Sequence, residues 1–416
     1  MLKSVTLLGS SSGRNAGDAA LISGIMDSID RVCDTNLLYE IPTIRPSYIT
    51  NNYPNRVQPI GMMPWDLSVK MLGVPTYRSI MRTDLSLIFD AILFDRALYN
   101  PLFNFLSTIY LMLPLAKKRG KRVGMYNVGV GPITTPAGEK MLRTIADLCD
   151  FITVRDQGSL DVLLSCGVTN PRIVLTADAA LNVDAPPDDR IETILQKVGL
   201  SSSQEILGLN VSAYLDSWAG AKNRKPLTRE QFVGIYSAAL SRVAAQINAP
   251  ILFVGTQVHD ASLSRELAAR IRSPKPVTFV GNEEYNHLEI RGVLSKLALL
   301  YGMRLHSIIL ASAGFTPVCG LPHQPKVGYY FETMGLDQFN MNFEDFSEEA
   351  VYQHLIKSWN ARAQIRKHLE QRIPVLKAEA FKAAELVATL HRGENIEQAV
   401  ANFGPAAAKK AAGGRF

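Results

Sequence analysis

The sequence predicts an α/β fold with two doubly wound, Rossmann-like domains. Short apolar runs typical of buried parallel strands alternate with longer segments of helical periodicity through most of the 416 residues. The alternation stops once, between residues 183 and 205, where the run DAPPDD and a serine triplet occur. Because strand–helix alternation produces parallel sheets with helices on both faces, each half of the chain is expected to form its own sheet.

These observations divide the chain into five parts. An N-terminal Rossmann-like domain is expected at residues 1–182, a linker at 183–205 and a C-terminal Rossmann-like domain at 206–345. Residues 346–392 have apolar side chains at helical spacing and are expected to form helices that cross between the domains. Residues 393–416, rich in Ala, Lys and Gly, are expected to form a flexible tail.

Composition and charge restrict the functional classes. The chain has 47% hydrophobic and 20% charged residues, which is typical of a globular protein. Its net charge of +6 favours anionic partners, but no basic stripe interleaves with aromatic residues, so no nucleic acid is expected. The scattered cysteines fit neither a metal site nor a disulfide framework and favour a cytoplasmic location. They are Cys33, Cys149, Cys166 and Cys319.

One uncharged stretch, residues 97–116, has the length of a membrane span. Pro101, Pro114 and two asparagines interrupt it, so a buried helix is expected. The cluster of Lys and Arg that follows at 117–122 leaves a membrane-facing patch as an alternative, with the protein peripheral at the inner face of the cell membrane. No signal peptide is evident, because residues 2–8 have the pattern of a short strand.

The loop after the first strand is a candidate anion site. A strand is expected at residues 5–9, then a loop of Ser and Gly, then an apolar helix at 19–29. Backbone N–H groups at such a helix start can bind anions. The loop lacks both the G-x-G-x-x-G and the G-K-[ST] patterns, and its Gly and Asp residues also occur in ordinary turns and caps.

Two neighbouring strands in the second half, expected at 298–301 and 316–321, are followed by basic side chains. These are Arg304, His306, His323 and Lys326. Open parallel sheets bind ligands at the carboxyl ends of their strands. Arg and Lys suit a carboxylate or phosphate, and His can transfer a proton near neutral pH. The pattern indicates an anion site with a proton donor, unless Arg304 only caps a helix and His306 is a core histidine.

The segments GMRLHS, AGFTPV and PKVGYYFETMGL resemble the polysaccharide pyruvyl transferase family. The positions that match in this block are Arg304, Leu305, His306, Gly314, Pro317 and Lys326. In the first half, the family patterns N-x-G-D, G-x-G-P and V-R-D-x-x-S are matched by Asn15, Gly17, Asp18, Gly129, Gly131, Pro132, Val154, Arg155, Asp156 and Ser159. The resemblance runs in order from residue 4 to residue 336. It departs near Asp95, where the family has a triple-glycine loop and this chain has no glycine.

The resemblance implies a glycosyltransferase-B-like fold, in which two domains face each other across a cleft. It also implies transfer of a ketal-linked pyruvyl group from phosphoenolpyruvate to a hexose of a cell-surface polysaccharide or glycan precursor, free or lipid-linked. No cofactor or metal beyond this co-substrate is expected. Arg155, Arg304, Leu305, His306 and Lys326 would bind the donor. Catalysis would rest on Arg155, Arg304 and His306, with an anion or acceptor loop formed by Asn15, Gly17, Asp18, Gly129 and Gly131.

Two alternatives stay open at this point. A glycosyltransferase-B enzyme with a nucleotide-sugar donor would need an acidic pair for the ribose, and Glu283 with Glu284 is the candidate pair. A glycan-binding homologue without activity would fit the altered segment near Asp95.

Overall fold

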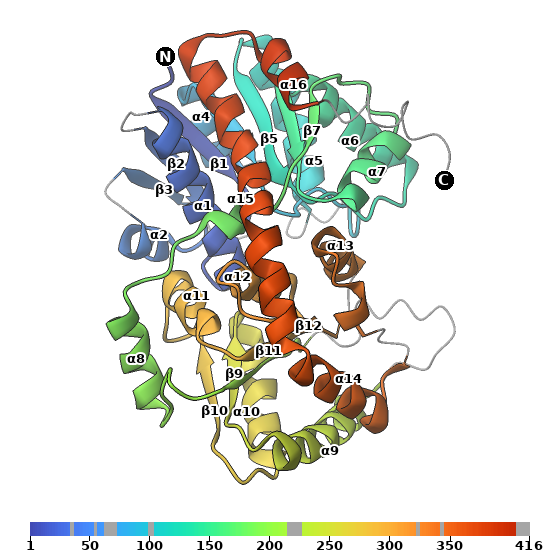
Figure 1. The fold of residues 1–416 in the computed structure, drawn as a ribbon. Coiled ribbons are helices and arrows are strands. Elements are labelled where there is room, and N and C mark those ends of the chain that lie inside the picture. Colours follow the sequence, from blue (N-terminus) through green and yellow to red (C-terminus); the bar gives the residue numbers. More distant parts are fainter. Residues whose placement is uncertain are drawn as a thin grey trace. The chain divides into compact units, whose positions relative to one another are not determined.

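The computed structural model describes residues 1–404 except for several internal segments (Figure 1). The residues outside the described part are 34–36, 54–55, 62–72, 99–103, 214–226, 322–324, 342–344 and 405–416. The chain divides into two compact units. Unit 1 contains Met1–Gly13, Leu21–Asn182 and the residues from Leu376 onward, whereas unit 2 contains Arg14–Ala20 and Val183–Val375.

Unit 1 is built on a seven-stranded sheet with the order β3-β2-β1-β4-β5-β6-β7, in which all paired strands are parallel. Its strands are β1 (Ser4–Leu8), β2 (Leu38–Thr43), β3 (Val57–Gly61), β4 (Leu85–Ile88), β5 (Arg122–Val128), β6 (Phe151–Val154) and β7 (Ile173–Leu175). The chain order reverses between β1 and β4, which is the topological switch point of this sheet.

Helices cover both faces of the unit 1 sheet. The elements that contribute are α1 (Ala16–Cys33), α2 (Pro46–Asn52), α4 (Val74–Arg82), α5 (Phe105–Lys118), α6 (Pro136–Leu148), α7 (Gln157–Ser165), η1 (Ala179–Asn182), the second part of α15 (Arg362–Arg392) and α16 (Ile396–Phe403). Buried residues of α4, α5 and α6 share one core with strand residues such as Met125. On the other face, the Asn127 side chain donates to the Ala380 carbonyl of α15 over 2.9 Å.

Unit 2 has a five-stranded parallel sheet with the order β10-β9-β8-β11-β12. Its strands are β8 (Leu207–Asn210), β9 (Ile251–Gly255), β10 (Val277–Gly281), β11 (Leu299–Gly302) and β12 (Val318–Gly320). The chain order reverses between β8 and β11, so the residues after these two strands flank the switch point of unit 2.

The unit 2 sheet is also covered on both faces. Its helices are α8 (Asp188–Lys197), α9 (Arg229–Ile247), η2 (Val258–Asp260), α10 (Ala261–Arg270), α11 (His287–Ser295), α12 (Leu305–Ser312), α13 (Pro325–Met334), η3 (Asp337–Phe339), α14 (Glu348–Asn360) and the first part of α15. Phe232 and Tyr236 of α9 stack with Phe346, and Tyr236 also stacks on Tyr301 of β11. This aromatic stack fixes α9 to the sheet.

The predicted fold class is confirmed, because each unit is a parallel α/β sheet covered by helices. The segment expected to be a linker differs from the prediction: residues 183–205 belong to unit 2 and contain α8. Ile191, Ile194 and Leu195 of α8 are fully buried, so this segment adds to a core, although its first residues lack apolar periodicity.

Two further segments differ from the expectation. Part of the expected tail forms α16, because Asn395 caps this helix and its Val400 is buried. The uncharged stretch forms α5 from Phe105 onward, and only one face of that helix is buried. Among the described residues, no helix is long and apolar enough to cross a membrane.

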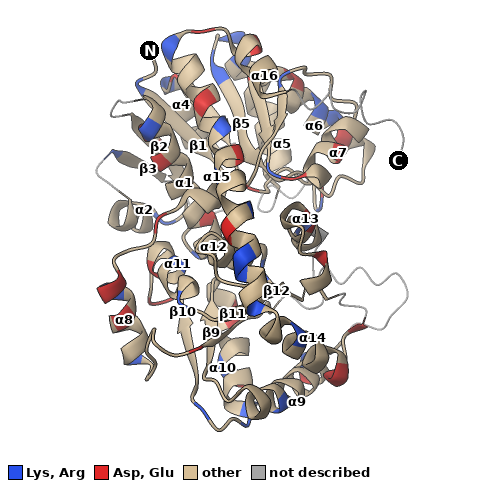
Figure 2. Cartoon of the chain, viewed as in Figure 1, with Lys and Arg blue, Asp and Glu red and all other residues tan. Residues whose placement is uncertain are grey.

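Lys and Arg residues are interspersed with Asp and Glu residues along the helices of both units (Figure 2). Many of them form ion pairs with one another, such as Arg229 with Glu266 and Arg265 with Glu283. Opposite charges therefore partly neutralise one another on these helices, and the expectation that no nucleic acid binds stays a prediction.

Candidate functional site

Asn210 organises the switch point of unit 2. It is the last residue of β8, and its side chain is buried. The side-chain oxygen accepts hydrogen bonds from the Arg304 backbone N–H (3.1 Å) and from the Ser307 hydroxyl (2.9 Å). The side-chain nitrogen donates to the Val254 carbonyl at 2.8 Å. One amide therefore joins the carboxyl ends of β8 and β9 to the start of α12.

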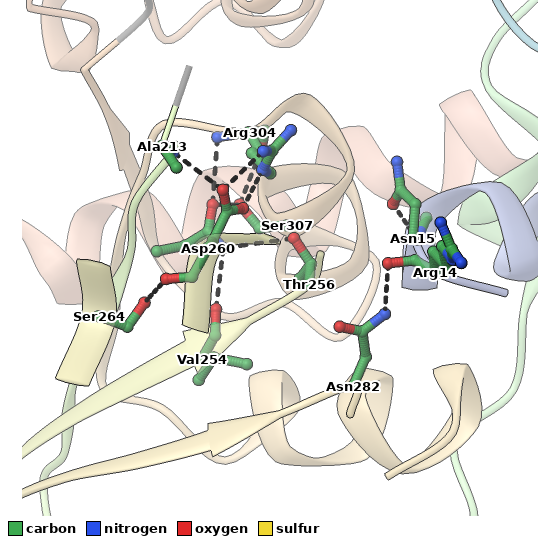
Figure 3. Close-up of polar contacts among 12 residues, drawn as sticks. Arg14, Asn15, Ala213, Val254, Thr256, Asp260, Ser264, Asn282, Arg304 and Ser307 are labelled. Atoms are coloured by element: carbon green, nitrogen blue, oxygen red, sulfur yellow. Dashed lines mark hydrogen bonds and ion pairs between the residues drawn. The ribbon is translucent and has the colours of Figure 1, made fainter. Parts of the chain in front are cut away.

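Arg304 is held by a buried carboxylate at this switch point (Figure 3). Its Nη2 donates to Asp260 Oδ1 over 2.7 Å, and its Nε donates to Asp260 Oδ2. Asp260 is fully buried and also accepts a hydrogen bond from the Ala213 backbone N–H at 2.9 Å. Although Arg304 occupies the N-cap position of α12, its side chain does not cap the helix. The planar fork is thus fixed in one orientation by a bidentate ion pair.

His306 lies in the first turn of α12 and is 8% exposed. Its Nδ1 lies 4.0 Å from Asp18 Oδ1, close enough for an ion pair when the ring is protonated. The ring also lies directly against Gly17, because a Cβ atom added at Gly17 would come within 2.3 Å of Nδ1. The N-x-G-D loop and the R-L-H triplet therefore form one local site.

The N-x-G-D loop belongs to unit 2, although it lies at the start of the chain. The Ala16 backbone N–H donates to the Thr256 carbonyl at 2.8 Å. The Arg14 carbonyl accepts from the Val258 N–H at 3.1 Å and from Asn282 Nδ2 at 3.0 Å (Figure 3). We predicted this loop as part of the N-terminal domain. The structure corrects that assignment, because these bonds attach the loop to the ends of unit 2 strands.

The start of α1 has the geometry of a capped helix. The side-chain oxygen of Asn15 accepts from the Gly17 N–H at 2.9 Å, and Asp18 lies in the first turn of α1. The helix begins at Ala16, earlier than the expected residue 19, because Asn15 supplies this partner.

Arg155 lies in unit 1 directly after β6, and its side chain is only 3% exposed. Its Nη1 donates to Asp178 Oδ2 at 3.0 Å, and its Nε lies 3.5 Å from Asp156 Oδ2. Burial lowers the pKa of Arg155, but the carboxylates of Asp178, Asp156 and Asp90 outweigh burial and hold the pKa above its ordinary value. Arg155 is therefore the cation of a buried charge network, not part of a surface ion pair.

The remaining motif residues of unit 1 support this network. Gly129 lies against the guanidinium, since an added Cβ would be 2.6 Å from Arg155 Nη2. The Ser159 hydroxyl accepts from the Val130 N–H at 2.9 Å and so holds the loop that contains Gly131. Asp156 caps α7 by accepting from the Ser159 N–H at 2.7 Å.

The structure thus gathers Asn15, Gly17, Asp18, Arg304, Leu305 and His306 in unit 2 and Gly129, Gly131 and Arg155 in unit 1. Lys326 lies in the first turn of α13, whereas His323 falls outside the described residues. Glu283 of the alternative acidic pair is bound to Arg265 at 2.6 Å. Within the described ranges, no group of three or more His, Cys, Asp or Glu side chains could hold a metal ion.

Sequence reasoning missed Asn210 and Asp260. Asn210 carries a usable signal, because it is a polar residue at the end of an apolar run. Asp260 carries none, since it resembles any acidic residue before a helix and reaches Arg304 only through tertiary structure.

A model of the family described as polysaccharide pyruvyl transferase matches residues 15–325. The chain is 23% identical over 395 residues to the amylovoran biosynthesis protein AmsJ of Erwinia amylovora, a match that covers 83% of this chain and 90% of AmsJ. The family model spans the loop at Asn15 and the strands of both units except β1.

Solved structures agree with the fold. One from Listeria monocytogenes, assigned as a UDP-N-acetylglucosamine 2-epimerase, has a TM-score of 0.61 at 11% identity and covers 95% of this chain and 97% of that chain. HepE of Anabaena, solved with UDP and glucose, has a TM-score of 0.52 at 13% identity and covers 99% and 100%. At such identities these likenesses show only the fold class, which is glycosyltransferase-B-like.

Proposed function

Because the chain belongs to the polysaccharide pyruvyl transferase family, we propose that it transfers a pyruvyl group from phosphoenolpyruvate to a hexose as a ketal. The acceptor is a sugar of a cell-surface polysaccharide or of its precursor. The similarity to AmsJ, a protein named for amylovoran biosynthesis, supports an exopolysaccharide acceptor. Phosphoenolpyruvate is the co-substrate, and the proposal includes no further cofactor.

The observation that carries the proposal is the pairing of Arg304 with Asp260 beside His306. The guanidinium cannot turn away from the strand ends while Asp260 holds it by two bonds. An oriented arginine can bind either the planar carboxylate of phosphoenolpyruvate or its phosphate, which has several anionic oxygens. The imidazole two residues later on α12 can supply a proton to a donor bound at this guanidinium.

The proposed reaction balances without an oxidant or reductant. His306 protonates the methylene carbon of phosphoenolpyruvate, which leaves an oxocarbenium-like centre at the neighbouring carbon. One sugar hydroxyl adds there and returns a proton to His306. A second hydroxyl of the same sugar then displaces inorganic phosphate, and the departing phosphate takes up the proton of this second hydroxyl. Arg304 and Lys326 stabilise the charge on the leaving phosphate.

Arg155 is assigned a different part in this proposal. Its three carboxylate neighbours and its burial support a role in holding the loop at Gly129 and Gly131. Direct contact between Arg155 and the donor stays a prediction, as do the role of that loop in acceptor binding and a cytoplasmic location.

Thermal melting of the purified chain tests the donor assignment. Phosphoenolpyruvate at a hundred times its dissociation constant should stabilise the native state by about 2.7 kcal/mol. We expect this shift in the wild type and not in Arg304→Ala. Arg265→Ala is the matched control, because it removes an exposed arginine of the same unit whose partner is Glu283.

A shift with nucleotide sugars and none with phosphoenolpyruvate would reject the proposal in favour of a nucleotide-sugar enzyme. Release of inorganic phosphate from phosphoenolpyruvate on addition of an acceptor polysaccharide would establish turnover. If a polysaccharide binds and no phosphate is released, the chain is a glycan-binding homologue.

A further inference from the structure

The side of α5 that faces away from the core of unit 1 is apolar. Leu111 and Leu115 are 58% and 51% exposed, whereas Ile109, Met112 and Leu113 of the same helix are buried. The two leucines lie four residues apart, so they are neighbours on one stripe of the helix. Pro114 lies between them on the same side and is partly exposed.

Exposed leucines need an explanation here because they are adjacent. Single exposed apolar residues are normal on protein surfaces. The other large exposed hydrophobic residues of the described part do not form such a pair on a helix; they are Met1, Leu38, Tyr329 and Val375. The buried core cluster of unit 1 includes residues of the packed face of α5, but neither Leu111 nor Leu115 belongs to it.

A cluster of cations follows the leucine stripe directly. Five of the six residues at 117–122 are Lys or Arg. Lys117 is bound to Asp150 at 2.9 Å, and Arg122 donates to the Leu390 carbonyl. Lys118 and Arg119 are exposed, and Lys118 continues the stripe of Leu111 and Leu115 along the helix. Cations at a helix C-terminus also favour the helix dipole, but that effect does not account for the leucines before them.

We propose that this stripe of α5, with Leu111, Pro114, Leu115, Lys118 and Arg119, docks on an anionic lipid bilayer. Apolar side chains on one face, with basic residues beside them, are the pattern of helices that lie in the membrane interface. Lys and Arg near anionic headgroups add attraction that falls off within a Debye length.

A lipid surface fits this stripe better than a protein partner does. Protein interfaces are depleted in Lys and bury about 800 Å² on each side, whereas this stripe offers two leucines and a proline beside lysine. The stripe also lacks aromatic anchors of the kind that dominate protein interfaces. Docking of this kind is weak and reversible, and it would bring the chain to the surface that carries any lipid-linked acceptor.

Sedimentation of the full chain with vesicles tests the proposal. We expect binding to vesicles that contain phosphatidylglycerol and no binding to pure phosphatidylcholine vesicles. Leu111→Ser/Leu115→Ser should weaken binding about tenfold or more, because it removes the apolar side chains that enter the membrane interface. Lys118→Glu/Arg119→Glu should have an effect of similar size, because it removes the attraction to anionic headgroups. Raising the salt concentration should weaken binding of the wild type.

Two matched controls distinguish α5 from general surface effects. Val375→Ser removes an exposed apolar side chain elsewhere, and Lys140→Glu/Arg143→Glu makes the same change of charge on the exposed side of α6. Both should bind vesicles like the wild type, and all variants should melt within a few degrees of it.

Equal binding by the α5 variants and the wild type, or no binding to anionic vesicles, would overturn the proposal. So would a wild type that is dimeric without lipid and becomes monomeric in Leu111→Ser/Leu115→Ser, because the stripe would then be a contact between two copies of the chain. None of these outcomes depends on whether the chain transfers pyruvyl groups.

Discussion

At the scale of single residues, Asp260 decides what Arg304 can do. A carboxylate that is fully buried and paired with one guanidinium is costly to keep unless the pair is well bonded. Here both oxygens of Asp260 bind Arg304, and the Ala213 N–H supplies a further bond. The pair therefore fixes the arginine at the strand ends, and Asp260 acts through Arg304 as a positioning residue.

We predict that Asp260→Asn weakens phosphoenolpyruvate binding tenfold or more, because the amide replaces one acceptor of the guanidinium with a donor. Loss of the buried pair should also cost about 3–5 kcal/mol of unfolding free energy. Calorimetric titration with phosphoenolpyruvate measures the first effect, and denaturant unfolding measures the second.

Arg304→Lys separates orientation from stability, because it keeps the charge facing Asp260 and loses the fork. This variant should fold and bind the donor weakly. Wild-type affinity in either variant would show that the pair does not orient a donor-binding group.

A second residue-scale prediction concerns Gly17. Gly17 lies inside α1 without a positive φ, so alanine at this position would ordinarily stabilise the helix by about 0.5–1 kcal/mol. The contact with His306 should instead make the alanine variant less stable than the wild type, since overpacking costs about 1–3 kcal/mol. Gly17→Ala should thus lower both the melting temperature and the turnover rate.

Gly234→Ala is the control for Gly17→Ala, because Gly234 lies in α9 with nothing near an added Cβ. It should raise stability by about 0.5–1 kcal/mol. If Gly17→Ala is also more stable than the wild type, then the loop does not pack on His306 in solution.

At the scale of elements, the V-R-D-x-x-S segment joins a strand, a loop and a helix. Arg155 follows β6, Asp156 caps α7, and Ser159 of α7 holds the loop after β5 through the Val130 N–H. These contacts hold the loop at Gly129, and the predicted part of Arg155 in donor binding and catalysis stays a prediction.

We predict that Ser159→Ala costs about 1–3 kcal/mol of unfolding free energy, because it removes the acceptor of the Val130 N–H in a buried setting. Ser165→Ala, at the exposed end of the same helix, should change stability by less than about 0.5 kcal/mol. Denaturant unfolding of both variants tests the difference, and equal stability of the two would contradict the structural role of Ser159.

At the scale of the whole molecule, a buried histidine makes stability depend on pH. Burial lowers the pKa of His287 to about 3, whereas an unfolded histidine has a pKa of about 6.5. Both states are neutral above pH 6.5, so stability is full there. Below that pH the unfolded state binds a proton that the folded state does not bind, and stability falls until about pH 3.

The expected loss attributable to His287 is about 2 kcal/mol between pH 6.5 and pH 5, at about 1.4 kcal/mol per pH unit. Denaturant unfolding of the wild type and of His287→Gln at pH 7 and pH 5 measures it. The variant should show a smaller loss on acidification. Identical losses in both proteins would mean that His287 is accessible to protons in the folded state.

The two-sheet fold was predictable from the sequence because strands and helices impose local periodicity on apolar residues. The strand before Arg304 and the helix after it both follow from residues within a few positions of each other. Segments without that periodicity were harder to predict, so α8 was expected to be linker.

Membership of the site could be predicted only in part. The motifs selected Arg304, His306 and Asp18 by type and spacing. Tertiary structure alone showed that the loop at Asn15 belongs with unit 2 and that Arg155 is enclosed by carboxylates.

The physical reason is sequence separation. Arg304 bonds to Asp260, 44 residues away, and to Asn210, 94 residues away. The residues next to each of the three in the sequence do not indicate that the other two are its partners. Local hydrophobic periodicity therefore determined the helices and strands, and with them the carboxyl strand ends at which ligand-binding residues were expected. The pairing of distant polar groups, fixed only when the sheet of unit 2 forms, decided which side chains stand together there.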